Sequence, residues 1–243
     1  MSRHVPRIFT PQTLVTQGSI SLTGKGAHHV MNVLRLEAGD FIHLFNGEDG
    51  EWSAKIWKTH KREVVLTVHL RVRPPATPSL LTLFFPLIKP ARLEWMIEKG
   101  TELGVTDFLP FRADYGSHKQ GNVERLEAIA QSAAEQSGRL TLPRLGSLKT
   151  LQDHLTLWQQ RVQTSALFWG DQASRMSLLE AVHAQPLPSA RGFLIGPEGG
   201  WSSSECDWLQ AHASILKPTS LGPTILRAET AAILGLGVLS VVQ

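Results

Sequence analysis

The hydrophobic pattern changes in character about a third of the way along the chain. Up to residue 72, apolar and polar residues alternate as in half-buried β-strands, and Asn46-Gly47 and Asp49-Gly50 supply turn signals between the alternating runs. The expected strands are residues 41–45, 54–57 and 64–72. Residues 28–40 fit a short helix followed by a turn. This pattern predicts a small β-barrel.

Beyond residue 78, short apolar runs alternate with stretches of helical periodicity, which is typical of an α/β domain. Strands are expected at residues 80–85, 108–111, 164–169, 193–195 and 215–216. Helices are expected at residues 90–103, 122–137, 175–184 and 231–242. Residues 140–163 are too weakly patterned for an assignment. The proline-rich segment 73–78 has the composition of a linker, so we expect one domain at residues 1–72 and another at 79–243.

The stretch from residue 192 to residue 231 contains two glycine–proline loops. One buried strand ends at once in Gly196-Pro197-Glu198-Gly199-Gly200, where proline restricts φ and the glycines leave backbone amides uncovered. Ser202 with Glu205 forms a capping-box pattern that predicts the start of a helix. The second loop, Gly222-Pro223, follows the next strand. Such pairs are often only tight turns, but two of them after adjacent strands would suit a small polar ligand such as a nucleoside.

Two segments of this stretch carry a family resemblance. GPEGGWSSSE at residues 196–205 and LGPTILRAETA at residues 221–231 together resemble the SPOUT-class RNA methyltransferases. Within that class the chain resembles the uridine N3-methyltransferases of small-subunit ribosomal RNA, the RsmE family. Further segments similar to the family are KPARLEWMIEKGTELGV at residues 89–105, EQSGR at 135–139, and the start of a PUA-like domain at 6–9 and 28–40.

The resemblance implies a fold, a cofactor and partners. It implies an α/β SPOUT methyltransferase domain with a deep trefoil knot, preceded by a small PUA-like β-barrel that binds RNA. Family members are homodimers whose cofactor sites lie near the interface. The implied cofactor is S-adenosyl-L-methionine (AdoMet), held by backbone groups of the glycine loops, and the implied partner is small-subunit ribosomal RNA. The candidate cofactor-binding residues are Gly170, Ile195, Gly196, Pro197, Gly199, Gly200, Leu221, Gly222, Ile225 and Leu226.

Methylation of uridine N3 sets specific demands on the catalytic residues. Donor and acceptor must lie in line, and no metal is required. The N3 proton must leave, and negative charge then spreads onto the two base oxygens. A fixed arginine is the natural stabiliser of that charge, and Arg227 is the candidate. Glu198 or Glu229 could help to remove the proton, although Glu198 could instead brace its own turn and Glu229 could serve the helix dipole.

The charge distribution adds candidates for RNA contacts. Residues 1–72 contain nine Lys and Arg against six Asp and Glu, whereas the other 171 residues hold fifteen of each. A modest excess of positive charge on a small module suits phosphate contacts, and it also occurs by chance. The candidate RNA-binding residues are Arg7, Arg35, Lys89, Arg92, Lys99 and Arg139. The same cations could instead form the solvated face of a packing helix, and EQSGR could be a local helix cap.

The chain departs from the family pattern after the strand at residues 108–111. The family usually carries a Glu-Arg pair there, and this chain has Arg112-Ala113-Asp114-Tyr115. The role of the family's arginine therefore cannot be carried over. Arg112 and Tyr115 are candidate substitutes, one by its charge and the other by stacking on a base.

Several classes of protein are disfavoured by what the sequence lacks. It contains no GxGxxG, GxxxxGK[ST] or HExxH motif, which argues against a dinucleotide enzyme, a P-loop NTPase and a zinc hydrolase. The single cysteine, Cys206, excludes an internal disulfide, and the adjacent His28 and His29 face different sides of a helix and make a poor metal pair. No apolar run has the length of a membrane span and the N-terminus does not resemble a signal peptide, so we expect a cytoplasmic protein.

The predicted function is AdoMet-dependent methylation of N3 of a specific uridine in small-subunit (16S) ribosomal RNA. One alternative is another SPOUT RNA methyltransferase that modifies a ribose 2′-hydroxyl or another base. The other alternative is a ribosome assembly factor without catalysis. The intact GPEGG and LRAET segments favour an enzyme over the assembly factor, and the PUA-like start with KxxRxEW favours the N3-methyltransferase over other SPOUT enzymes.

Overall fold

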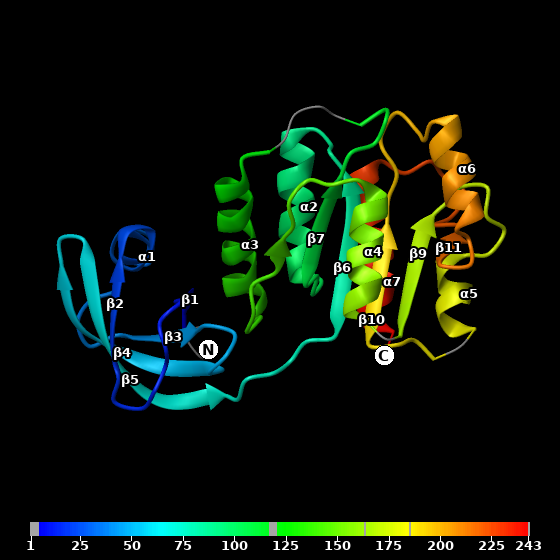
Figure 1. Cartoon of the computed structure of the whole chain (residues 1–243). Coiled ribbons are helices and arrows are strands. Elements are labelled where there is room, and N and C mark those ends of the chain that lie inside the picture. Colours follow the sequence, from blue (N-terminus) through cyan, green and yellow to red (C-terminus); the bar gives the residue numbers. More distant parts are fainter. Residues whose placement is uncertain (1–4, 117–120, 163, 185, 243) are drawn as a thin grey trace. The chain divides into compact units, whose positions relative to one another are not determined.

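The protein is described by a computed structural model over residues 5–116, 121–162, 164–184 and 186–242 (Figure 1). The chain forms two compact units. Unit 1 consists of Met1–Thr77 together with Ala134–Leu142, and unit 2 consists of Pro78–Ala133 and Pro143–Gln243. The first unit therefore includes a short segment from the middle of the chain. Among the described residues, the longest and most apolar helices still fall short of what crossing a bilayer would take.

Unit 1 is built on a five-stranded sheet in the order β1-β3-β4-β5-β2. Its strands are β1 Arg7–Phe9, β2 Ser19–Thr23, β3 Phe41–Phe45, β4 Glu51–His60 and β5 Glu63–Arg73. The pair β1–β3 is parallel, and the pairs β3–β4, β4–β5 and β5–β2 are antiparallel. The three strands expected from alternation are confirmed as β3, β4 and β5. The helical segment comprises α1 Gly24–His28 and the π-helical turn η1 His29–Val33, so it begins four residues earlier than expected.

One face of this sheet forms the core of unit 1. The inward residues of β3, β4 and β5 are fully buried, and Ala27 and Val30 of α1 and η1 belong to the same apolar cluster. Successive side chains of a strand point to opposite faces, so the buried residues of these strands share one face of the sheet. The helical segment covers that face only.

Unit 2 contains a six-stranded parallel sheet in the order β11-β9-β10-β6-β7-β8. Its strands are β6 Leu80–Pro86, β7 Asp107–Phe111, β8 Arg144–Leu145, β9 Ser165–Gly170, β10 Ala190–Leu194 and β11 Leu216–Thr219. Its helices are α2 Pro90–Glu102, α4 Leu151–Arg161, α5 Leu178–His183, α6 Ser203–Ala211 and α7 Ala228–Val241, with most of α3 Val123–Ser137. The parallel α/β architecture expected from the sequence is confirmed.

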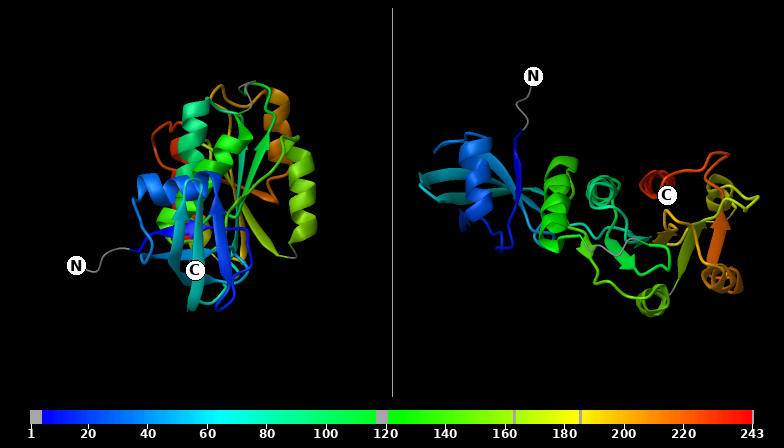
Figure 2. Two further views of the ribbon diagram at one scale, coloured as in Figure 1. Left: turned by 90° about the vertical axis from the view of Figure 1, so that its left-hand side faces the viewer. Right: turned by 90° about the horizontal axis from the view of Figure 1, so that it is seen from above.

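The sheet is buried on both sides, as parallel sheets usually are. One apolar cluster joins Leu83 and Phe85 of β6 to α2, α5 and α7, while another joins Phe84 to α4 and α6. Figure 2 shows α2, α5 and α7 on one face of the sheet and α4 and α6 on the other. The near-continuous burial of β6 therefore follows from helices on both faces.

Three helices differ from the sequence expectation, and one of them, α7, begins three residues earlier than expected, at Ala228. Residues 140–163 contain β8 and α4, which the weak apolar pattern did not reveal. In α4 only Leu151, His154, Leu155 and Trp158 are buried, so most of the helix is polar and solvated. The expected helix at 175–184 begins later, at Leu178, after a capping box formed by Ser177 and Glu180.

The strand order places the carboxyl ends of β9, β10 and β11 side by side. In open parallel sheets, ligands bind in the crevice outside these ends. The last helix, α7, packs on α2 and against β10 and β6. The trefoil knot stays a prediction, since strand order and packing define neighbours and not the threading of one loop through another.

Candidate functional site

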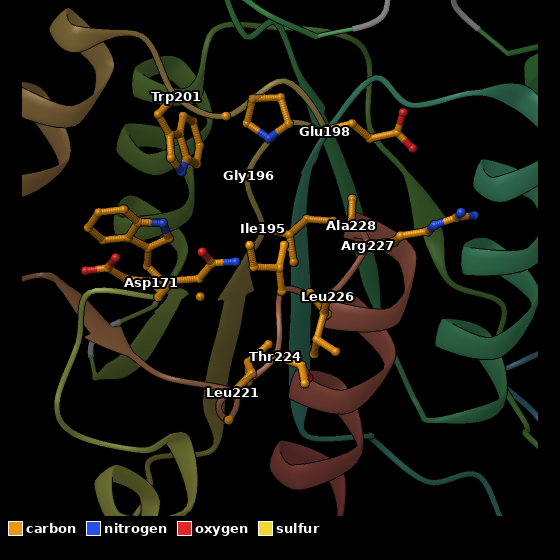
Figure 3. Close-up of a pocket in the computed structure, with 18 of the residues that line it drawn as sticks. Asp171, Ile195, Gly196, Glu198, Trp201, Leu221, Thr224, Leu226, Arg227 and Ala228 are labelled. Atoms are coloured by element: carbon orange, nitrogen blue, oxygen red, sulfur yellow. The ribbon is translucent and has the colours of Figure 1, made fainter.

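A pocket of about 620 Å³ lies at the carboxyl ends of the adjacent strands of unit 2 (Figure 3). Three loops and the beginnings of two helices form its walls. The loops follow β9, β10 and β11, and the helices are α2, which follows β6, and α7, which follows the last of these loops. Its volume is in the range of pockets that hold small-molecule ligands and cofactors.

The loop after β10 is a tight turn anchored at both ends. The N–H of Gly200 donates to the carbonyl of Pro197 at 3.0 Å, and Gly200 has φ +80°, which favours glycine. At the far end, Ser202 Oγ accepts from the N–H of Glu205 at 3.3 Å and Glu205 Oε2 accepts from the N–H of Ser202 at 2.8 Å. The predicted capping box is confirmed, and it sets the direction in which α6 leaves the pocket.

Aromatic rings form one wall of the pocket. A Cβ on Gly196 would lie 2.7 Å from Trp201 Nε1, so the glycine is what allows the Trp201 ring to rest on the backbone. Trp201 stacks on Phe111 with ring centroids 5.9 Å apart and meets Trp169 edge-on at 6.3 Å. Trp169 is 5% exposed, and its Nε1–H has no hydrogen-bond partner among the described residues. A buried donor without a partner in a pocket wall is available to an acceptor on a ligand.

Gly199 lies outside this lining, although it belongs to the same turn. A Cβ at Gly199 would lie 2.9 Å from Tyr115 Cβ, so the segment after β7 approaches this glycine closely, although the glycine stays exposed. Asp114 of that segment accepts from Ser202 Oγ at 2.5 Å, and its N–H donates to Glu205 Oε1 at 3.1 Å. The segment where the chain departs from the family pattern thus holds the start of α6.

The loop after β11 supplies the second glycine–proline turn. Gly222 has φ +118°, and its N–H donates to Ser220 Oγ at 3.2 Å. Ile225 is 84% exposed at the pocket. Nine of the ten candidate cofactor residues line the pocket, all except Gly199: Gly170, Ile195, Gly196, Pro197, Gly200, Leu221, Gly222, Ile225 and Leu226.

Arg92 joins two candidate catalytic carboxylates. Its Nη1 is ion-paired with Oε1 of Glu198, and its Nε lies 3.4 Å from Oε1 of Glu229. Glu229 does not line the pocket, and its buried Oε2 has no partner among the described residues. Arg92 therefore links the start of α2, the glycine turn after β10 and the start of α7. The position of the Glu198 side chain is explained better by its ion pair with Arg92 than by a role in bracing its own turn.

Like Lys89, Arg227 is a pocket cation that takes no part in the Arg92 ion pairs. It is exposed, precedes α7 in extended conformation and lines the pocket. Among the described residues it forms no ion pair within 4.0 Å. Figure 3 shows Glu198 and Arg227 on one side of the pocket and Trp201 and Asp171 on the opposite side. A ligand in this pocket would meet an aromatic wall with Asp171 at one end and Glu198 with Arg227 at the other.

The other cations expected to contact RNA fall in different surroundings. Lys89 lines the pocket with Arg92. Lys99, near the far end of α2, donates to Glu98 at 2.7 Å and to Glu102 at 2.9 Å, and these hydrogen bonds raise the pKa of Lys99. Arg35 is exposed in unit 1 with a left-handed φ of +54°.

Arg7 is engaged in internal contacts of unit 1. Its side chain is 7% exposed and lies 3.0 Å from Glu51, which also binds His43 and Arg73. Arg7 donates to the carbonyls of Ala134 and Glu135, each at 2.9 Å, and to that of Arg139 at 2.6 Å. The EQSGR segment is thus held through its carbonyl groups.

Arg139 and Glu51 show the electrostatic cost of this arrangement. Burial lowers the pKa of the Arg139 guanidinium to about 10. Burial by itself raises the pKa of Glu51, but hydrogen bonds from Arg7 and Arg73 outweigh it and hold that pKa below its usual value. These contacts give Arg7 a structural role.

Several pocket residues were not anticipated from the sequence. They are Trp169, Gln172, Trp201, Thr224, Ala228 and Ala231, whereas the loop Gly170-Asp171 was expected as a third loop of the pocket. Trp201, Thr224, Ala228 and Ala231 lie inside the two segments that carry the family resemblance, so membership of those segments was a usable signal for them. The sequence indicates Trp169 only as part of a buried strand and gives no sign that it lines a pocket.

Comparisons with known proteins agree with this architecture. Residues 75–240 match the family model of the RNA methyltransferase domain, and residues 22–68 match that of the RNA methyltransferase PUA domain. The ribosomal RNA small subunit methyltransferase E of Rickettsia conorii is 33% identical over 93% of this chain and 91% of its own length. That of Bacillus subtilis is 31% identical over 96% and 93%.

Solved structures show the same fold. A methyltransferase of Legionella pneumophila in complex with bound S-adenosylmethionine is 28% identical, covers 98% of this chain and 97% of its own, and has a TM-score of 0.81. The methyltransferase E of Neisseria gonorrhoeae, also bound to S-adenosylmethionine, matches with the same TM-score at 24% identity over 97% of both chains. The chain belongs to the ribosomal RNA small subunit methyltransferase E family, with an RNA methyltransferase PUA domain before an RNA methyltransferase domain.

Proposed function

We propose that this protein transfers the methyl group of AdoMet to N3 of one uridine in small-subunit ribosomal RNA. The observation that carries the proposal is the pocket, in which two glycine–proline loops, an aromatic wall and an available arginine meet. The names of the relatives and the AdoMet bound in the Legionella structure support the cofactor and the class of RNA.

The residues of the pocket fit AdoMet as a ligand. Ile195, Leu221 and Leu226 offer apolar surface for a flat base, and the glycines leave backbone groups accessible. The buried Trp169 Nε1–H lacks an acceptor that a nucleoside or carboxylate oxygen would supply. When bound, AdoMet supplies a methyl group on a sulfonium centre.

We assign Arg227 to the uracil. Loss of the N3 proton leaves negative charge on the two base oxygens, and a fixed guanidinium at the pocket stabilises it. Glu198 is the favoured acceptor of the proton because it lines the pocket, whereas Glu229 does not. Arg92 is the positioning residue for both carboxylates through its two ion pairs. Lys89, at the same pocket, and Arg35, on unit 1, remain candidate phosphate contacts.

We further propose that the protein acts as a homodimer in the cytoplasm, where its ribosomal substrate is assembled. Ile225 at the pocket is 84% exposed and Leu234 on α7 is 42% exposed. Large apolar side chains at such positions are suited to burial by a second copy. N3 lies on the Watson–Crick edge of uracil, so the target must be unpaired or flipped when it reacts.

The proposal is tested by identifying the methylated nucleoside. Small subunits from bacteria that lack this methyltransferase are incubated with the purified protein and labelled AdoMet, and their RNA is digested and analysed by mass spectrometry. The expected product is 3-methyluridine at one position. A ribose-methylated nucleoside or another methylated base would establish a different SPOUT activity. Tight binding to subunits without any methylation would favour the assembly factor.

A further inference from the structure

The outward face of the sheet in unit 1 carries exposed aromatic rings. Trp57 of β4 is 74% exposed and Phe41 of β3 is 47% exposed. Their strand neighbours Ile42 and Ile56 are at most 1% exposed in the core. Alternation along a strand therefore directs Phe41 and Trp57 away from the side that α1 and η1 cover.

Two irregularities in the pairing of β4 with β5 leave Trp57 and His69 without cross-strand partners. Ile56 pairs with Leu66 and Lys58 pairs with Val65, so Trp57 is an extra residue without a partner. Ser53 pairs with Leu70 and Ala54 with Val68, which leaves His69 as a second extra residue. Bulges of this kind re-aim side chains and are over-represented near functional sites.

Phe41, Lys55, Trp57 and His69 together are here called the aromatic face. The rings of Phe41 and His69 have centroids 5.8 Å apart, and Lys55 Nζ lies 5.8 Å from the Phe41 centroid. Phe41 and Lys55 are direct cross-strand partners, and Trp57 lies two residues further along β4. Cation and aromatic ring thus alternate over neighbouring strands.

The β4–β5 hairpin, which carries most of the aromatic face, has an excess of positive charge, whereas Asp40 beside Phe41 is acidic. The β4–β5 hairpin adds Lys58, Lys61 and Arg62, all of them exposed. Its one acidic residue beyond the buried Glu51 is Glu63, which accepts a hydrogen bond from Ser21 at 2.5 Å. An apolar patch for a protein partner would not need interleaved cations, whereas RNA requires both stacking surfaces and phosphate partners.

We propose that the aromatic face binds unpaired RNA bases, with Phe41 and Trp57 as stacking platforms and Lys55 with the hairpin cations facing the phosphates. Every base has a π-face, so stacking holds a strand with little regard for sequence. The face would hold RNA that flanks the target nucleotide, and this inference rests on the proposed function in so far as RNA is the substrate.

The test compares surface variants of the full chain. Phe41→Ala and Trp57→Ala remove one ring each, and Lys55→Gln removes one charge. Matched controls are Val33→Ala on η1 (58% exposed), Lys25→Gln on α1, which covers the opposite side of the sheet, and Trp95→Ala on α2 (43% exposed). Affinity is measured for naked small-subunit RNA and for assembled small subunits over a salt series, with AdoMet calorimetry and thermal unfolding of each variant.

Loss of either ring is expected to weaken binding to naked RNA by roughly 5- to 100-fold. Lys55→Gln should reduce the slope of log affinity against log salt by about 1, because one phosphate contact is lost. The control variants should bind as the wild type does. AdoMet binding and unfolding should be unchanged in all of them.

Each other outcome overturns the inference. If the wild type binds RNA and methylates it while Phe41→Ala and Trp57→Ala bind equally well, the aromatic face is not the RNA site and the proposed function stands. Loss of binding to assembled subunits alone would identify a protein partner. If the wild type binds neither substrate, both proposals fail together.

Discussion

Replacing Gly196 by alanine is the sharpest probe of the pocket. The added methyl group would lie 2.7 Å from Trp201 Nε1, 3.0 Å from Cε2 and 3.3 Å from Cζ2. Favourable contacts between such atoms need about 3.5 Å or more, so the indole ring must move by roughly 0.5–0.8 Å. The ring is not free to turn away, because Phe111 stacks on one face and Trp169 meets it edge-on.

The magnitude follows from where the strain goes. Overpacking of this kind costs about 1–3 kcal/mol. If the ring moves into the pocket, the same energy is lost from ligand binding, which corresponds to a Kd for AdoMet raised by roughly 5- to 100-fold. If the ring stays in place, the folded state is destabilised instead. The same strain energy is divided between the two effects, so we expect a raised Kd for AdoMet together with a lowered free energy of unfolding.

The assay is titration calorimetry with AdoMet beside thermal and denaturant unfolding. Gly237→Ala on α7 is the matched control, since a Cβ there has no neighbour within 4 Å. Alanine in a helix is favoured over glycine by about 0.5–1 kcal/mol, so this control should bind normally and unfold no more easily. A Gly196→Ala protein with wild-type affinity and wild-type stability would refute the steric argument.

Three further predictions concern other parts of the molecule. Arg227→Ala should lower kcat by about a hundredfold or more while the Kd for AdoMet changes little, because the charge it stabilises forms only in the transition state; equal losses in both quantities would make Arg227 a cofactor or folding residue. Arg7→Ala should cost about 1.5–3 kcal/mol of stability at neutral pH, because Glu51, 3% exposed, loses one charged partner and keeps Arg73 and His43. The pKa of Glu51 is lowered in the folded state, so the stability that this carboxylate contributes is present above the unfolded pKa near 4.3 and is lost as the pH falls through the folded pKa. Denaturant unfolding of the wild type and of Arg7→Ala over a pH series should therefore show their difference in unfolding free energy shrinking in acid. A difference that is constant with pH would contradict this account. Leu234→Glu should convert the proposed dimer to monomers in analytical ultracentrifugation, and a protein that is monomeric before the substitution would refute the dimer.

The sequence by itself determined the features that depend on near neighbours. The capping box of Ser202 and Glu205 is one of them, because both groups lie within one helical turn. The strands at 80–85 and 193–195 are others, since short apolar runs bounded by turn residues were sufficient to identify them. The family was also identifiable, because its motifs are contiguous segments. The helix α4 escaped because its few buried side chains give a weak pattern.

The tertiary structure alone decided which distant residues meet. Arg92 was expected to face RNA, but the packing of α2 beside α7 brings it to Glu198 and Glu229. Gly199 has the same chemistry as Gly196, yet Gly199 lies next to Tyr115 and Gly196 lies next to Trp201. The sequence does not distinguish Arg7 from other basic residues. The fold shows that Arg7 donates to three carbonyl groups of the segment Ala134–Leu142. A side chain's role depends on the charge and space around it, and these are set by strand order and helix packing that bring residues far apart in the chain together.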